Sequence, residues 1–173
     1  MDLASTIRNV PDFPKKGIVF RDITTLLKNK EALRLSLDML YEHYKNERID
    51  KVVGVESRGF ILGAALAAKL GAGFVPIRKP GKLPADKVRQ EYQLEYGNDA
   101  IEIHRDAIEK GERVLIHDDL LATGGTILAA SKLVEQLGGT IVGLSFLIEL
   151  SFLQPRKRLA QYTIFSLITY DRE

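Results

Sequence analysis

The chain has 173 residues, 45% of them hydrophobic and 28% charged, with a formal net charge of +2 and no cysteine. These values predict one globular domain covering residues 1–173 and exclude disordered proteins, fibrous proteins, disulfide scaffolds and thiolate metal sites. The small net charge also argues against a nucleic-acid-binding protein, which would carry a clear excess of basic residues.

Signals for membrane insertion and secretion are missing from the sequence. The first residues, Met1 to Ala4, lack the basic start and apolar run of a signal peptide. No apolar stretch approaches the ~18 residues that a membrane-spanning helix needs. We therefore expect a cytoplasmic protein with no membrane partner.

In chain order, an irregular start is followed by alternating helices and strands. Residues 10–17 are rich in turn formers and predict irregular structure. Apolar residues recur on one helical face over about residues 31–45, and small residues fill a second predicted helix over 60–70. Short apolar runs at 52–55 and 74–77 predict two buried strands.

Residues 80–90 have a different character from the segments before them. They contain two prolines, a glycine and several charges without periodicity, which predicts a mobile and functional loop. Residues 93–96 and 100–104 flank Gly97-Asn98-Asp99 and predict a hairpin. We therefore expect a flexible loop over about residues 80–97.

The rest of the chain continues the alternation. A third buried strand is predicted at 114–116, a helix at 126–137 that ends at Gly138-Gly139, and further strands at 141–147 and 163–168. Strands that alternate with helices predict an α/β fold with a mainly parallel sheet flanked by helices.

The most informative stretch runs from Arg113 to Thr126. An apolar strand is followed by Asp118 and Asp119, then by a loop of small residues, and then by a helix. The loop residues are Ala122, Thr123, Gly124, Gly125 and Thr126. Ligands of open parallel sheets bind beyond the carboxyl ends of the strands. Successive N–H groups of this loop and the positive end of the following helix predict a phosphate site.

Two acids beside a phosphate would repel it unless they face another group. Ribose hydroxyls, or the polar face of a hydrated metal ion, would suit Asp118 and Asp119, so the stretch predicts a site for a sugar 5-phosphate. The plain alternative is a strand end with a glycine turn, and two glycines alone would favour it. Gly81-Lys82 is followed by Leu83, which excludes an NTPase phosphate loop, and Gly71-x-Gly73 lacks the third glycine of a dinucleotide site.

This stretch resembles the phosphoribosyl-diphosphate (PRPP) motif of the type I phosphoribosyltransferases. Further blocks look like those of the adenine phosphoribosyltransferases; they cover residues 11–14, 17–23, 56–60, 77–84 and 94–97. Hypoxanthine and orotate enzymes are poorer matches, because they typically carry Glu-Asp where this chain has Asp118-Asp119. The resemblance implies the type I phosphoribosyltransferase fold, with a small N-terminal hood over about residues 1–28.

The resemblance implies that adenine and PRPP react to give AMP and pyrophosphate, with Mg²⁺ carried by PRPP and no metal site of the protein's own. The loop 122–126 would bind the 5-phosphate, and Asp118 and Asp119 would bind the ribose hydroxyls. The pyrophosphate group would be bound by Ser57, Arg58, Arg78, Lys79 and Lys82. The resemblance also implies a homodimer, in which Arg78 is a candidate to reach the neighbouring subunit's site. Without the resemblance, these basic residues would be interpreted as part of a solvated surface loop.

For adenine, the resemblance implies stacking between Phe20 and Leu150. Main-chain groups of Val19 and Arg21 would read the 6-amino group and N1. By spacing alone, Phe20 could equally be an ordinary core residue.

Two residues and one turn gain a role only from the resemblance. Glu95 is the candidate for handling the N9 proton or orienting the base, although its spacing alone suggests an exposed strand residue. Tyr96 would help to close a lid over the site, which keeps water from the activated sugar. Glu56-Ser57 matches a turn that carries a non-proline cis peptide in the family. His117, in contrast, is expected to be a core histidine that points away from the site and has its hydrogen bonds satisfied.

Two other functions remain open from the sequence. One is a phosphoribosyltransferase for hypoxanthine, guanine or xanthine. The other is a non-catalytic regulator that senses PRPP, which should carry a DNA-binding segment or a larger basic face; neither is present in the chain. A panel of bases assayed with PRPP and Mg²⁺ distinguishes these possibilities.

Overall fold

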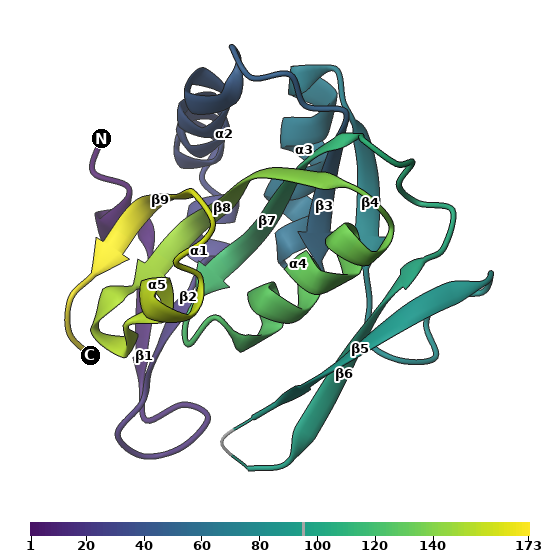
Figure 1. Ribbon diagram of the computed structural model, residues 1–173. Coiled ribbons are helices and arrows are strands. Elements are labelled where there is room, and N and C mark those ends of the chain that lie inside the picture. The colour runs from purple at the N-terminus through teal and green to yellow at the C-terminus, as the bar shows by residue number, and fades with distance from the viewer. Residues whose placement is uncertain (95) are drawn as a thin grey trace.

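The computed structural model describes residues 1–94 and 96–173. A five-stranded sheet lies at its centre, in the order β4-β3-β7-β8-β9, with every neighbouring pair parallel (Figure 1). Its strands are β3 (Lys51–Val55), β4 (Gly73–Ile77), β7 (Arg113–Leu121), β8 (Thr140–Leu150) and β9 (Ile164–Tyr170). The predicted α/β fold with a mainly parallel sheet is confirmed.

Helices cover both faces of the sheet. Helices α2 (Lys30–Tyr44) and α3 (Gly59–Leu70) pack on one face, after the short helix α1 (Thr24–Leu27), and α4 (Gly125–Gln136) packs on the other. Asn29 begins α2, because its side chain accepts hydrogen bonds from the Glu31 and Ala32 amides. Each face therefore has its own apolar cluster, around Leu40 and Leu66 on one side and around Leu133 on the other.

Two antiparallel hairpins stand apart from the sheet. Strands β1 (Arg8–Pro11) and β2 (Val19–Asp22) form the first, and β5 (Lys87–Gln93) and β6 (Asn98–His104) form the second, which we call the lid hairpin. Figure 1 shows both at the bottom of the molecule. The irregular start predicted for residues 10–17 is therefore wrong at its beginning. Proline is tolerated in an edge strand such as β1, so Pro11 concealed the strand from the sequence.

Element ends differ from the predictions where strands leave the core. The loop expected over residues 80–90 ends early, because β5 begins at Lys87, which lies opposite His104. The hairpin exists as predicted, but it pairs residues 87–93 rather than 93–96 with β6. Strand β7 continues to Leu121, so the acid pair lies inside the strand rather than after it.

The topology places two strand ends side by side at the centre of the sheet. The chain leaves β3 for β4 in one direction and leaves β7 for β8 and β9 in the other. Open α/β sheets bind ligands where the strand order reverses in this way. The reversal falls between β3 and β7, which are followed by residues 56–58 and by the loop 122–126.

Three short helical turns complete the structure: η1 (Ala4–Thr6), η2 (Ser151–Leu153) and α5 (Pro155–Arg158). Turn α5 follows β8 and lies at the same edge of the sheet as the loop before α4. Among the described residues, no helix has the length and apolar character needed to span a membrane.

Candidate active site

The loop between β7 and α4 surrounds a hollow of about 210 Å³ at the carboxyl edge of the sheet. Its lining runs from Leu120 to Ile127 and includes Asp118. Gly124 has φ +89°, a conformation that favours glycine, and α4 begins at the next residue. The first N–H groups of a helix have no partner within it, so this hollow is suited to an anion. The structure thus brings all five predicted loop residues to one hollow.

The acid pair lies beside this hollow at the end of β7. Asp119 is buried and accepts a hydrogen bond from Arg58 Nε at 2.6 Å. Asp118 Oδ1 accepts one from the Asp119 amide at 2.8 Å. A Cβ on Gly59 would lie 2.8 Å from Asp118 Oδ1, so only glycine leaves room for this carboxyl group at the start of α3.

The electrostatics of the acid pair suit a hydroxyl or cationic ligand. Burial and the neighbouring charge of Asp119 raise the pKa of Asp118 well above its usual value. Two neighbouring carboxylates resist full ionisation together, so the protonated form of Asp118 is favoured more than in an isolated aspartate. A bound hydroxyl group could then accept a hydrogen bond from one acid and donate one to the other.

The turn after β3 is tied to the end of β4. The Glu56–Ser57 peptide bond is cis, as the resemblance implied. Glu56 accepts hydrogen bonds from Arg78 Nη2 and from the Lys79 amide, each at 2.8 Å. Burial acts to raise the pKa of Glu56, but the Lys79 amide, Arg78 and nearby Lys82 lower it overall. Ser57 and Arg58 are exposed just beyond this clamp.

The two predicted pyrophosphate-binding lysines lie apart from the β7–α4 hollow. The Lys79 ammonium pairs with Asp99 and lies 3.4 Å from Tyr92 Oη, both on the lid hairpin. Burial acts to lower the pKa of Lys79, but these two partners raise it overall. Lys82 is exposed in the connection before β5. Only Arg58, among the predicted cations, directly contacts the acid pair in this structure, within the described residues.

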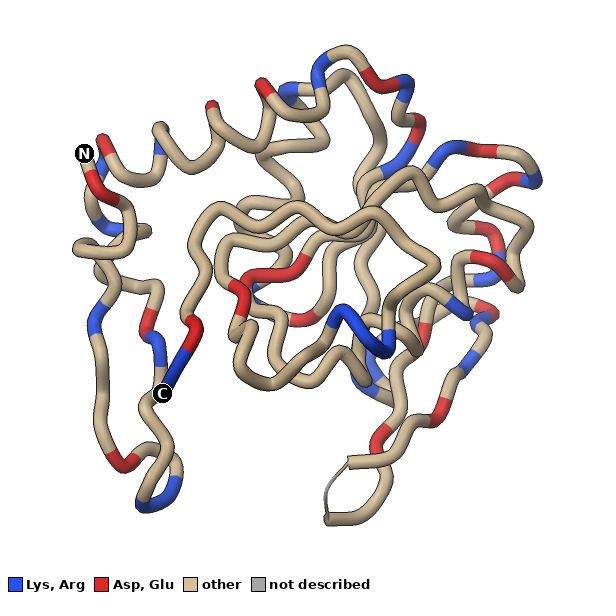
Figure 2. The backbone as a smooth tube through the Cα atoms, turned by 60° about the vertical axis from the view of Figure 1, so that its left-hand side comes forward, with Lys and Arg blue, Asp and Glu red and all other residues tan. Residues whose placement is uncertain are grey.

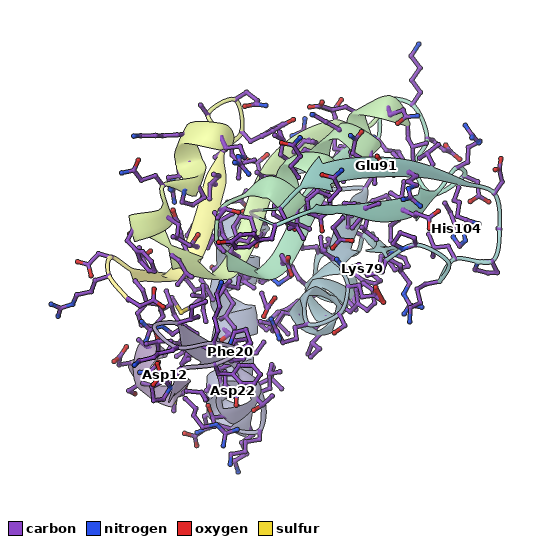
Figure 3. The ribbon with its side chains drawn as sticks, turned by 90° about the horizontal axis from the view of Figure 1, so that it is seen from below. Asp12, Phe20, Asp22, Lys79, Glu91 and His104 are labelled. Carbon is purple, nitrogen blue, oxygen red and sulfur yellow. The ribbon has the colours of Figure 1, made fainter. Side chains whose placement is uncertain are left out.

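Phe20 lies on the side of the hood that faces the sheet. Of the three hood residues labelled in Figure 3, it is the nearest to the rest of the molecule. Phe13 meets its ring edge-on at 5.2 Å, and the Arg58 guanidinium lies 5.3 Å from its centroid. Arg58 therefore links the predicted base-stacking ring to the predicted ribose-binding acid Asp119.

Two of the other residues predicted to contact adenine, Val19 and Arg21, contact residues near the end of the chain in this structure. The Val19 amide donates to Glu173 Oε1 at 2.7 Å, and the Arg21 guanidinium lies 4.0 Å from the Tyr170 ring. These contacts join the hood to the last residues of the chain. Leu150 is half-buried at the end of β8.

The tip of the lid hairpin approaches the hood. Tyr96 is 80% exposed, and its ring centroid lies 5.6 Å from Lys15 Nζ. Figures 1 and 2 show the hood loop and the hairpin tip projecting from the same side of the molecule. Glu95, the predicted acid-base residue, lies outside the described residues.

His117 lies in the core, as predicted, rather than in the hollow. Its Nδ1 lies 3.1 Å from Ser145 Oγ, and its Nε2 has no partner among the described residues. Burial lowers the pKa of His117 to about 4, so the ring is neutral at physiological pH. The expectation of a fully satisfied histidine is therefore half met.

Sequence reasoning missed a second acidic group at this edge. Glu149, near the end of β8, is only 2% exposed and accepts two hydrogen bonds of 2.8 Å from Arg156 of α5. The nearby Arg158 lies beside the loop before α4. A single carboxylate in the apolar run 141–150 was the available signal, but its basic partner could not be identified from spacing.

The described residues do not form a metal-binding cluster of their own. Across residues 1–94 and 96–173, no three His, Cys, Asp or Glu side chains are arranged to hold a metal ion. Beside the hollow, Asp118 and Asp119 carry oxygen atoms of the kind that Mg²⁺ prefers. They fit a Mg²⁺ ion that takes most of its ligands from a bound diphosphate and from water.

Known proteins match this chain over nearly its whole length. Residues 22–170 match the model of the phosphoribosyl transferase domain. The adenine phosphoribosyltransferase of Thermotoga petrophila is 60% identical over 98% of this chain and 100% of its own length. The crystal structure of the Thermoanaerobacter pseudethanolicus adenine phosphoribosyltransferase has a TM-score of 0.95 at 54% identity, covering 97% of this chain and 98% of that one.

A more distant structure agrees with these relatives. The APRTase of Giardia lamblia, complexed with 9-deazaadenine, has a TM-score of 0.93 at 41% identity and covers 99% of each chain. The predicted type I phosphoribosyltransferase fold is thus confirmed. Sequence identities of 41–60% over nearly the full length show a relationship by family and not by fold alone. The chain belongs to the adenine phosphoribosyltransferase family.

Proposed function

We propose that this protein transfers phosphoribose from PRPP to adenine and releases AMP and pyrophosphate, in purine salvage. The bond from C1′ of the ribose to the pyrophosphate oxygen breaks, and the oxygen keeps the electron pair. Adenine N9 forms the new bond to C1′ and loses its proton. The observation that carries this proposal is the β7–α4 hollow, with a loop suited to phosphate and two acids beside it.

The hollow would hold the sugar at both ends. Its loop, residues 122–126, would bind the 5-phosphate through backbone N–H groups and the hydroxyls of Thr123 and Thr126. Asp118 and Asp119 would bind the ribose hydroxyls and stabilise the positive charge that develops on the ring as pyrophosphate leaves. The raised pKa of Asp118 supports the contact with the ribose hydroxyls, because a protonated carboxyl group can donate to a hydroxyl oxygen. Asp119, which pairs with Arg58, would be the acid that stabilises the positive charge.

The leaving group would be bound at the ends of β3 and β4. Ser57, Arg58, Arg78, Lys79 and Lys82 are the proposed pyrophosphate-binding residues. Arg58 would exchange its contact with Asp119 for the pyrophosphate, which frees that acid for ribose. Mg²⁺ bound to the pyrophosphate would neutralise the charge that develops on it. The protein's own part is to orient the substrates and exclude water.

Adenine would bind beneath the hood. Phe20 and Leu150 would stack on the base, and main-chain groups of Val19 and Arg21 would read its edge; Glu173 would then give up its contact with the Val19 amide. Glu95 would handle the N9 proton or orient the base, and Tyr96 would close the lid hairpin over it. The Lys15–Tyr96 contact supports such closure, because it already joins hood to hairpin.

Three further features stay predictions. They are a homodimer with Arg78 reaching the partner's site, a cytoplasmic location, and a single domain with a hood over about residues 1–28 and a flexible loop over about 80–97. Light scattering of the purified protein tests the first directly.

A substrate panel tests the proposed function. The protein is incubated with PRPP, Mg²⁺ and adenine, hypoxanthine, guanine or xanthine, and nucleotide and pyrophosphate are measured. We expect AMP and pyrophosphate in equal amounts, with adenine the fastest base. Faster turnover of another purine would reassign the substrate, and tight PRPP binding without pyrophosphate release for any base would indicate a sensor.

The role of Glu95 needs its own variant. We expect Glu95→Gln to lower kcat by about 10²-fold or more while PRPP affinity stays near wild type, since general acid–base catalysis contributes on this scale. Glu91→Gln is a matched control, because Glu91 is an exposed acid of the same hairpin. An unchanged kcat in Glu95→Gln would remove its catalytic role.

A further inference from the structure

The short turn α5 forms an outer wall of the phosphate loop. A Cβ on Gly124 would lie 3.2 Å from Leu159 Cδ1 and 3.6 Å from Pro155 Cβ. A Cβ on Gly125 would lie 3.0 Å from Arg158 Nη1. Turn α5 and its C-cap residue therefore press directly on the two glycines at which α4 begins.

An ion pair between the buried carboxylate of Glu149 and the exposed Arg156 holds α5 in this place. Glu149 receives both hydrogen bonds of the Arg156 guanidinium and a third from Ser166 Oγ at 2.9 Å. The hydrogen bonds from Arg156 lower the pKa of Glu149, although burial acts to raise it. The carboxylate is therefore ionised at neutral pH. Since Glu149 belongs to the central sheet, the pair fixes α5 to the same rigid frame as the phosphate loop.

Arg158 opens onto a second hollow beside the loop. This hollow, of about 370 Å³, is lined by Tyr92, Gln93, Leu94, Thr123, Gly125, Thr126 and Arg158. It shares Thr123, Gly125 and Thr126 with the hollow proposed for the phosphate. An arginine next to these three residues can donate two parallel hydrogen bonds to phosphate oxygens.

The charge balance of the edge favours such a role. Of the three basic residues at the end of α5, Arg156 is neutralised by Glu149. The other cations proposed for PRPP lie after β3 and β4, where the leaving group would bind. Among the described residues, Arg158 is therefore the basic side chain placed to contact a doubly charged 5-phosphate at the loop.

We propose that Arg158 is a further binding residue for the 5-phosphate. Its guanidinium lies next to Gly125, in a hollow that Tyr92 and Gln93 of β5 also line. The proposal rests on the proposed function, because it takes the ligand of the loop to be a sugar phosphate. Arg158 binds the phosphate in substrate and product alike. Its removal therefore weakens both without slowing the bond change itself.

Calorimetry with AMP and with adenosine tests this role. We expect Arg158→Ala to weaken AMP binding about tenfold or more, because it removes charge-assisted hydrogen bonds, and to leave adenosine binding within about twofold of wild type. Arg158→Lys should fall between, since lysine keeps the charge but loses the paired donors. Lys157→Ala is the matched control, because it removes the adjacent exposed cation of the same turn.

Kinetics provide a second readout. The KM for PRPP should rise about tenfold in Arg158→Ala, with kcat within about threefold of wild type. Near-normal AMP affinity in Arg158→Ala, or an equal loss of AMP and adenosine affinity, would overturn the proposal. If the wild-type protein fails to make AMP, the proposed function fails, while the AMP and adenosine affinities still decide the role of Arg158.

Discussion

The sheet edge and the two hairpins build the candidate site in different ways. At the sheet edge, Asp119 and Glu149 are 7% and 2% exposed, and they lie in the central strands β7 and β8. On the hairpins, Phe13 and Tyr96 are 50% and 80% exposed. Buried contacts fix geometry before a ligand arrives, whereas exposed ribbons are free to adjust. The proposed phosphate end of the site is therefore preorganised, and the proposed base end depends on how hood and lid hairpin meet.

The largest effect is expected from Gly124→Val in the rigid half. Valine is strained at φ +89°, and its Cβ would lie 3.2 Å from Leu159 Cδ1. The loop would shift away from the geometry that binds phosphate. We expect kcat/KM for PRPP to fall by at least about 100-fold, since a 1 Å misplacement has consequences of this size.

Gly111→Val is the matched control for that variant. Gly111 has φ +87°, but a Cβ there would meet nothing within 4 Å. It should lose stability without losing turnover per folded molecule. Equal activity of the two variants would mean that the loop is not preorganised for substrate.

Asp119→Asn should have the next largest effect. The substitution keeps the shape but removes the charge that Arg58 meets at 2.6 Å and that would stabilise the ribose ring in the transition state. We expect kcat to fall about 10- to 100-fold, on the scale of lost electrostatic stabilisation. Asp86→Asn removes an exposed acid paired only with Arg105 and should leave kcat unchanged. Normal kinetics in Asp119→Asn would remove this acid from the site.

Glu149→Gln tests how much the ion pair with Arg156 stabilises the protein, because Glu149 has no proposed contact with the substrates. Loss of the charged pair should lower the free energy of unfolding by about 1–3 kcal/mol at neutral pH, measured in urea. Because Arg156 lowers the folded-state pKa of Glu149, the stabilisation is present above the usual carboxyl pKa and is lost as the pH falls through the folded-state value. The wild-type advantage should thus disappear only in acid. An advantage that persists unchanged at the lowest pH would contradict the charge-based account.

The smallest effect is expected from Lys15→Ala, at the contact between hood and lid hairpin. An exposed cation–π contact contributes about 0.5–1 kcal/mol, so kcat/KM for adenine should fall no more than about fivefold. Lys16→Ala removes the neighbouring exposed charge and serves as its control. A loss as large as that of Gly124→Val would show that the hairpins, too, must be preorganised.

Local residues and their order were sufficient to predict much of the rigid half. The stretch from Arg113 to Thr126 pointed to a strand, a phosphate loop and a helix, because each part depends on nearby residues. The end of β7 was predicted too early, since Asp118 and Asp119 are polar. Only the pairing with β8 shows that the strand continues through them.

The hairpins and α5 were beyond local reasoning. Strand β1 pairs with β2 across a connection of seven residues, and neither strand alternates clearly between apolar and polar residues. Turn α5 has four residues, too few to show a helical period. The place of Arg158 beside Gly125 depends on the pair between Glu149 and Arg156, which belong to different elements.

By itself, the sequence determined the α/β alternation, the strand–loop–helix around Gly124 and the family, because periodicity and a continuous motif are properties of neighbouring residues. The tertiary structure alone decided that Arg58 would meet Asp119, that Lys79 would turn to the lid hairpin, and that Arg158 would lie over the loop. Such contacts join residues far apart in the chain. They form only when the burial of the sheet's two apolar faces has brought the strand ends together.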